Sequence, residues 1–242
     1  MHTQEHRRTV NMGCPSLAGI LLASGVVLVA VVVQSVAGLA EALQWQRSAG
    51  AGLSWLTSHL SHWSWNHLAW DLFAFGLLSL LCLRLMPSRY AFCLFVAAVL
   101  IPLEIQIDQP LLESYRGLSG IDCALLGLVV AALWRQSSGD RNWGAAQALA
   151  LLGGCGFLAK TMYELTTGGT VFVEPGQEPF VPVISAHLVG FLSGATLGLA
   201  RMGRRRWDRH GVSADEGGMI RSIRLLKKWH RRETAGLRGS EP

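Results

Sequence analysis

A serine between glycines opens one of the apolar stretches of this chain, in the motif Gly117-Leu118-Ser119-Gly120. Glycines around a serine allow close backbone approach and a sharp start to a helix. The N–H groups at such a helix start are free and can stabilise an oxyanion beside the serine hydroxyl. The motif predicts a nucleophile at Ser119. The competing interpretation is helix packing, because glycine and serine are common at contacts between membrane helices.

A histidine followed by spaced glycines lies further along, in Ala186-His187-Leu-Val-Gly190 with Gly194 beyond it. Gly190 and Gly194 are four residues apart, so they share one helix face and let the helix press against a neighbour. His187 lies one turn before Gly190 and points toward the same neighbour. An imidazole held there is the base that a serine needs to lose its proton. The alternative is a buried histidine that only bonds a carbonyl.

A third polar cluster, His59, His62, Asn66, His67 and Asp71, leads into another apolar stretch. His67 and Asp71 are four residues apart on one helix face, and so are His62 and Asn66. Zinc is the obvious rival ligand, but no HExxH pattern occurs and Asp71 is the one evident acidic ligand, so we expect no metal and no cofactor. The alternative use is as donors: His67 and a neighbouring group would hydrogen-bond a tetrahedral oxyanion.

The elements that must position these groups are membrane-spanning helices. Half of the 242 residues are apolar and only 15% are charged, which excludes an ordinary soluble domain. Residues 17–39 carry no charge, and the hydrocarbon core of a bilayer needs about 20 residues of helix. The sequence predicts an all-α membrane protein with six transmembrane helices. The six apolar stretches are roughly 17–39, 64–83, 91–107, 119–135, 144–163 and 183–200.

Loop charges predict the orientation of these helices. Lys and Arg mark the cytoplasmic side of a membrane protein, and they gather at alternate loops and at both ends of this chain. Both termini are therefore predicted to be cytoplasmic, in a bacterial-type inner membrane. The predicted parts are an N-terminal tail (1–16), the membrane domain (17–200) and a basic tail (201–242). That tail holds 12 Lys+Arg and 5 Asp+Glu, and we expect it to lie against anionic lipid and not nucleic acid.

The predicted topology places the three clusters at similar depth. Ser119 starts a span from the outer face, and His67 and His187 lie near the outer ends of their spans. A polar pathway through a transporter or channel would instead need polar residues across the full depth of the membrane. The common depth favours one water-accessible site near the outer surface.

In this order along the chain, the three motifs resemble the rhomboid family of intramembrane serine proteases. The matching segments are His62-Trp-Ser-Trp-Asn66-His67-Leu-Ala-Trp-Asp71, Gly117-Leu-Ser119-Gly120 and Ala186-His187-Leu-Val-Gly190-Phe-Leu-Ser-Gly194. The resemblance covers about residues 17–200. It implies a six-helix bundle of rhomboid type with a Ser–His dyad, in which Ser119 is the nucleophile, His187 the general base and His67 an oxyanion donor.

One position departs from the family pattern, which usually has Asn where this chain has Asp71. A carboxylate there would repel an oxyanion, so Asp71 would serve only if protonated, and otherwise it would orient His67. Asn66 is a substitute donor, although it lies about 100° from His67 around the helix. Asp71 is also the one feature that favours an inactive rhomboid-like protein that binds membrane clients.

Two further segments look like the rhombosortase branch of that family: Leu43-Gln-Trp-Gln-Arg47 and Lys160-Thr-Met-Tyr-Glu164-Leu-Thr-Thr-Gly168. The branch implies a membrane-anchored substrate whose C-terminal sorting segment spans the membrane and ends in basic residues. By spacing alone, Lys160 and Glu164 form an i,i+4 ion pair at a helix end. Asp122, one turn after Ser119, either orients His187 as a third catalytic group or, as we expect, pairs with another polar group such as Asp71.

Overall fold

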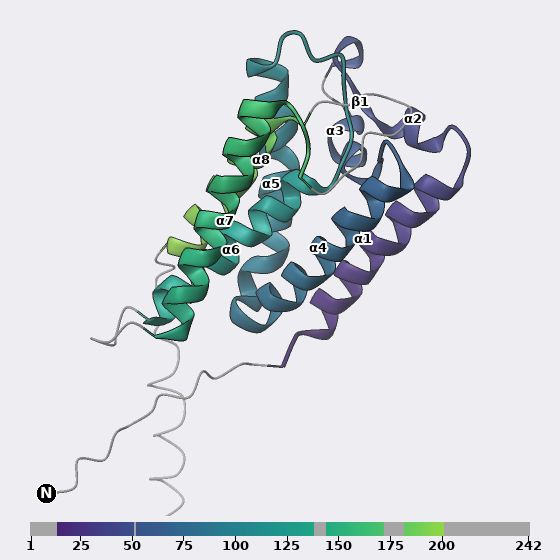
Figure 1. Cartoon of the computed structure of the whole chain (residues 1–242). Helices are drawn as coiled ribbons and strands as arrows, with labels where there is room; N and C mark the ends of the chain where they lie inside the picture. The colour runs from purple at the N-terminus through teal and green to yellow at the C-terminus, as the bar shows by residue number, and fades with distance from the viewer. Residues whose placement is uncertain (1–13, 51, 138–143, 172–181, 201–242) are drawn as a thin grey trace, which may run out of the picture. The chain divides into compact units, whose positions relative to one another are not determined.

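The computed structural model describes residues 14–50, 52–137, 144–171 and 182–200, and this part of the chain is mostly helical (Figure 1). Each of the six predicted apolar stretches contains one long helix. These helices are α1 (Leu17–Ser35), α4 (Trp65–Leu85), α5 (Pro87–Asp108), α6 (Ser119–Ser137), α7 (Ala145–Thr167) and α8 (Ile184–Leu199). Most of the predicted N-terminal tail and the whole basic tail lie outside the described residues.

Four of these helices, α1, α4, α5 and α7, are long and apolar enough to cross a membrane by length and composition. Helix α8 is apolar but has only 16 residues. Large apolar side chains point away from the packed interior, among them Leu21, Phe73, Phe95 and Leu152, each more than 60% exposed. Such extensive apolar exposure is rare on soluble monomers and is typical of a surface that meets lipid. The protein is therefore a helical membrane protein.

The first apolar stretch ends earlier than predicted. Helix α1 stops at Ser35, not near residue 39, and Val36 is already extended. Gly38 then adopts a positive φ of 75° and caps the short helix α2 (Leu39–Leu43). A glycine is suited to that turn because it has no Cβ to clash in the left-handed region. The chain turns out of the first helix at Gly38 although the residues on both sides are apolar.

Helix α6 lies at the centre of the bundle and packs against α4, α5, α7 and α8. Its residues Ala124, Leu125 and Leu128 are completely buried. A helix that is apolar on all sides is expected in the interior and not at the surface. The serine motif is thus carried by the most buried helix.

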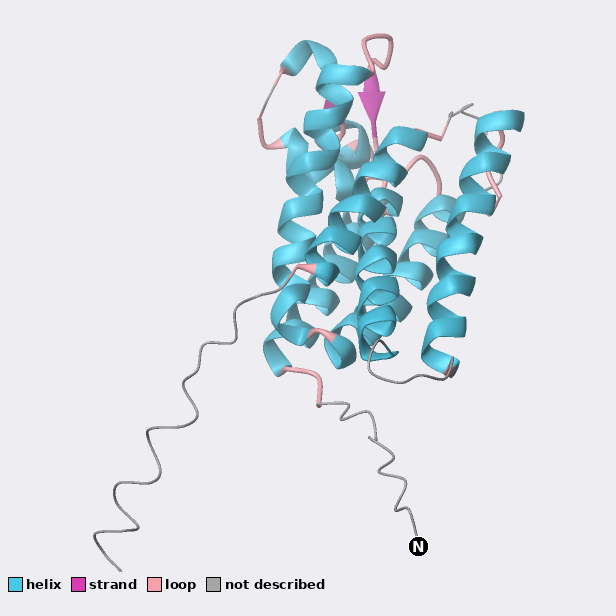
Figure 2. Ribbon diagram, turned by 90° about the vertical axis from the view of Figure 1, so that its left-hand side faces the viewer, coloured by secondary structure: helices cyan, strands magenta, loops and turns pink. Residues whose placement is uncertain are grey.

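Short elements gather at one end of the bundle, where α6 begins (Figure 2). They are β1 (Trp45–Gln46), η1 (Arg47–Ala49), α3 (Ser54–Thr57), η2 (Ser58–Leu60) and β2 (Ser114–Tyr115). Strands β1 and β2 pair antiparallel, with Trp45 opposite Tyr115. The Arg47 guanidinium donates to the carbonyls of Ile105, Gln106, Gln109 and Leu112 around the end of α5. These contacts hold the segment that leads into Ser119.

Candidate active site

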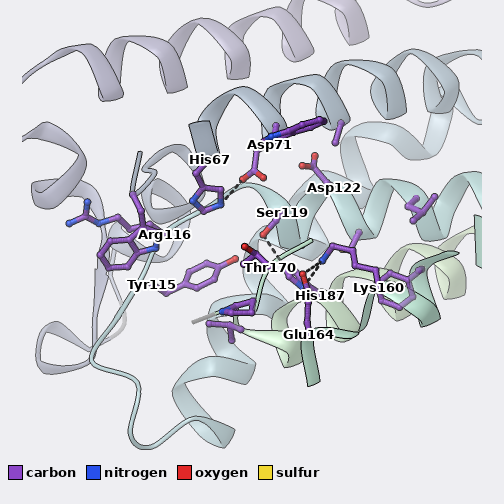
Figure 3. A pocket seen from close by; sticks show the side chains of 18 of the residues that line it. His67, Asp71, Tyr115, Arg116, Ser119, Asp122, Lys160, Glu164, Thr170 and His187 are labelled. Atoms are coloured by element: carbon purple, nitrogen blue, oxygen red, sulfur yellow. Dashed lines mark hydrogen bonds and ion pairs between the residues drawn. The ribbon is translucent and has the colours of Figure 1, made fainter. Parts of the chain in front are cut away.

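Ser119 and His187 meet at the start of α6 and the first turn of α8 (Figure 3). His187 Nε2 lies 3.0 Å from Ser119 Oγ, which is hydrogen-bonding distance. His187 is only 6% exposed, while Ser119 is half-buried. This hydroxyl–imidazole pair is the arrangement that allows an imidazole to accept the serine proton.

Close packing of α6 against α8 sets this distance. A Cβ built on Gly190 would overlap the carbonyl oxygen of Gly120, and one built on Gly194 would overlap that of Ala124. From the other helix, a Cβ on Gly127 would overlap the carbonyl oxygen of Phe191. The two backbones therefore touch along three turns, as small residues permit in membrane helices. Gly190 and Gly194 lie on the face of α8 that carries His187, as predicted from their spacing.

The backbone before Ser119 is held in a conformation that suits glycine. Gly117 has φ +132°, which side chains rarely tolerate, and a Cβ there would lie 3.2 Å from His67 Cε1. Its N–H donates to the Ser58 carbonyl, and its own carbonyl lies 3.4 Å from His59 Nδ1. Burial lowers the pKa of His59 to about 4, so this imidazole is neutral at neutral pH. Residues of η2 thus secure the turn that presents the serine.

Three nitrogen atoms surround one carboxylate oxygen of Asp71. Its Oδ2 lies 3.0 Å from the Leu118 amide nitrogen, 3.1 Å from His62 Nε2 and 3.4 Å from His67 Nε2. Donors that converge in this way suit an accepting carboxylate. Asp71 therefore contacts and orients His67, the second of the two roles considered for it, and ties α4 to the residue before Ser119.

Two of the other predicted site residues have different positions. Asn66 is exposed and does not line the cavity around Ser119. Gly120 faces α8 and α5, where a Cβ would lie 2.8 Å from Ile101 Cδ1 and 3.4 Å from the Ala186 carbonyl oxygen. The exposed position of Asn66 does not favour a role as substitute oxyanion donor. The N–H groups of the first turn of α6 have no intrahelical partner and are the better donors.

A carboxylate on α7 completes the surroundings of His187. Glu164 Oε2 lies 3.3 Å from His187 Nδ1, and Glu164 is 2% exposed. Lys160 Nζ lies 2.6 Å from Glu164 Oε1, which is the ion pair expected from their spacing. The contact with His187 was not predicted, because helix periodicity pairs residues within α7 but does not reveal its neighbour. The one sequence feature that pointed to this contact was a lysine and a glutamate at the end of an apolar stretch.

Asp122 lines the cavity beside Ser119. The carboxylate that contacts His187 is Glu164 and not Asp122, which was considered as a third catalytic group. Asp122 is 6% exposed, and among the described residues its Oδ1 has no hydrogen-bond partner. Among the described residues, no hydrogen bond joins Asp122 to Asp71, the pairing considered for it. A buried carboxyl oxygen without a partner is unfavourable for folding.

Replacing Asp122 with leucine is therefore expected to stabilise the protein by about 1–3 kcal/mol, since the leucine side chain has no polar atom to desolvate. The measurement is the thermal unfolding midpoint in detergent. Asp108→Leu, at an exposed position, is the matched control and should not raise the midpoint. A lower midpoint for Asp122→Leu would mean that this carboxyl has a stabilising partner.

A cavity of about 790 Å³ opens beside Ser119. Leu77 of α4, Leu126 of α6 and Leu152 of α7 contribute to its apolar lining, while Ser119, Lys160 and His187 contribute polar groups. Leu126 follows Ser119 by seven residues, or about 10 Å along the helix. The cavity thus leads from the serine along the apolar faces of α4 and α7. Among the described residues, no group of three or more His, Cys, Asp or Glu side chains is arranged to hold a metal.

Comparison with known proteins adds no assignment. No protein-family model matches this chain, and no curated protein matches it at a significant level. The function is therefore inferred from the residues and their geometry. These describe a helical membrane protein with a buried Ser–His–Glu constellation at one end of its bundle.

Proposed function

We propose that this chain is an intramembrane serine endopeptidase of rhomboid type, with six spanning helices and both termini in the cytoplasm. The observation that carries the proposal is the 3.0 Å separation of Ser119 Oγ and His187 Nε2 beside a large, mostly apolar cavity. An apolar cavity with a few converging polar groups is the usual form of a ligand site. Its position on helices with lipid-facing surfaces favours a substrate that is itself embedded in the membrane.

In the proposed reaction, Ser119 Oγ attacks the carbonyl carbon of a peptide bond while His187 Nε2 takes the hydroxyl proton. The tetrahedral oxyanion accepts hydrogen bonds from the first amides of α6. The C–N bond then breaks, and His187 returns the proton to the leaving amine. Water attacks the resulting acyl-enzyme, His187 accepts its proton, and Ser119 Oγ recovers that proton as the new carboxyl group leaves.

The proposed substrate is a spanning segment that unwinds at small residues. Glycine-rich segments lose helical structure at low cost, and their exposed backbone then reaches Ser119 through the cavity between α4 and α7. The resemblance to the rhombosortase branch further suggests a C-terminal sorting segment of a membrane-anchored protein. A reaction of this kind needs no cofactor.

The test is covalent labelling of the purified, detergent-solubilised protein with a fluorophosphonate. Wild type should label and Ser119→Ala should not, because the probe needs an activated serine. Ser35→Ala is the matched control, since the Ser35 hydroxyl bonds the Val31 carbonyl of its own helix. Equal labelling of wild type and Ser119→Ala would eliminate Ser119 as nucleophile.

A second candidate function is an inactive rhomboid-like protein that binds membrane clients, which the carboxylate at Asp71 favours. Proteoliposomes that contain the protein and a spanning reporter with a glycine-rich segment distinguish the two. The endopeptidase cleaves the reporter, whereas a client-binding protein retains it intact.

A further inference from the structure

Among the described residues, Glu164 is the carboxylate that forms an ion-pair contact with the ring of His187, at the nitrogen that does not face Ser119. Its Oε2 lies 3.3 Å from Nδ1, and no other group among the described residues hydrogen-bonds that oxygen. Both side chains are almost completely buried: that of His187 is 7% exposed and that of Glu164 is 2% exposed. A charged oxygen in such surroundings is stabilised only by a close positive or N–H group.

Lys160 holds the other oxygen of the same carboxylate. Its Nζ lies 2.6 Å from Glu164 Oε1 and 3.5 Å from His187 Nδ1. The lysine therefore restricts the rotation of Glu164, one turn away on α7, and leaves Oε2 directed at the imidazole. Figure 3 draws these three side chains as one connected group with Ser119.

We propose that Glu164 is a positioning residue that, held by Lys160, turns the Ser119–His187 pair into a triad. This inference rests on the proposed peptidase function and adds a residue to it. Glu164 selects the tautomer of His187 with the proton on Nδ1, which leaves the Nε2 lone pair free to accept the serine proton. Without the carboxylate, Lys160 would donate to Nδ1, and Nε2 would carry the proton and could not act as base.

The two α7 residues also act on the charge of His187 in opposite directions. When His187 accepts the serine proton, Glu164 stabilises the resulting cation and Lys160 opposes it. Other charged groups that line the same cavity are Asp71 from α4, Asp122 from α6, and Glu113 and Arg116 from the segment before α6. Because the effects of Glu164 and Lys160 oppose each other, the imidazolium is stable enough to form. It is still acidic enough to return its proton to the leaving amine.

The test measures the second-order rate of fluorophosphonate labelling of the full chain between pH 4 and 10. Glu164→Gln should lower the plateau rate about 10²- to 10⁴-fold. Its acid limb should move to lower pH, because an anion beside the imidazole is lost. Lys160→Met should lower the rate less, and its acid limb should move to higher pH, because a cation is lost. A purely structural role would not separate the two variants in this way.

Glu41→Gln is the matched control, because Glu41 also forms an ion pair, 3.0 Å from Arg116 Nη1, but its side chain is 59% exposed. It should retain the wild-type rate and profile. Elution volume and helical circular dichroism verify that each variant is folded.

The outcomes separate the two proposals. Wild type without Ser119-dependent labelling contradicts the peptidase function itself. If wild type labels normally and the labelling rate of Glu164→Gln is within twofold of the wild-type rate at every pH, only the role of Glu164 is overturned. Acid limbs that move in the same direction in the two α7 variants would also overturn it.

Discussion

Valine at position 194 is expected to abolish fluorophosphonate labelling of Ser119 without touching either reacting group. A Cβ at Gly194 would overlap the Ala124 carbonyl oxygen and lie 2.7 Å from its carbon and 3.0 Å from the Leu128 nitrogen. Backbone atoms cannot rotate away as a side chain would, so α8 must move off α6. A shift of even 1 Å would lengthen the 3.0 Å contact beyond a productive hydrogen bond.

The matched control is Gly154→Val on α7, where a Cβ meets no atom within 4 Å. It places the same residue in another helix of the bundle and should label normally. Gly194→Ala is the intermediate case and should lose most labelling while it still elutes as a folded protein. Full labelling of a folded Gly194→Val protein would show that the α6–α8 contact does not set the Ser–His distance.

Leucine in place of Asp71 is expected to destabilise the protein by about 3–5 kcal/mol, the usual effect of breaking a buried charged network from one side. The substitution leaves the Leu118 amide, His62 Nε2 and His67 Nε2 without the oxygen that they share. Because Leu118 directly precedes Ser119, labelling should fall together with the thermal midpoint. Both quantities are measured on the detergent-solubilised protein.

Asp71→Asn should recover much of this loss. The amide keeps an accepting oxygen for the Leu118 N–H but no longer offers a charge to the two histidines, so the midpoint should lie between those of wild type and Asp71→Leu. Its N–H₂ group also adds a donor near Leu118, where the proposed reaction would form an oxyanion. If Asp71→Leu matches the wild-type midpoint, the contacts around Asp71 contribute nothing net to the fold.

Several features of this protein follow from local pattern alone. The apolar stretches specify long helices because a helix satisfies its own backbone hydrogen bonds wherever side chains are apolar. Glycines four residues apart mark the contact face of α8, and His187 lies on that face by helix periodicity. The motif order predicted that Ser119 and His187 belong to one site, and their contact is observed.

The contacts between helices at the candidate site depended on which helices are neighbours and how each helix is rotated. The spacing of Lys160 and Glu164 predicts their ion pair, but only the position of α7 beside α8 brings Glu164 to His187. The contact of Asp71 with the Leu118 amide depends on the approach of α4 to the loop before Ser119. Only the packed bundle shows that Asp122 Oδ1 is buried without a hydrogen-bond partner among the described residues. Helix periodicity is a local property of roughly 3.6 residues per turn, so it assigns residues to faces. Contacts between faces come from packing the whole bundle at once, and no single segment of sequence contains that information.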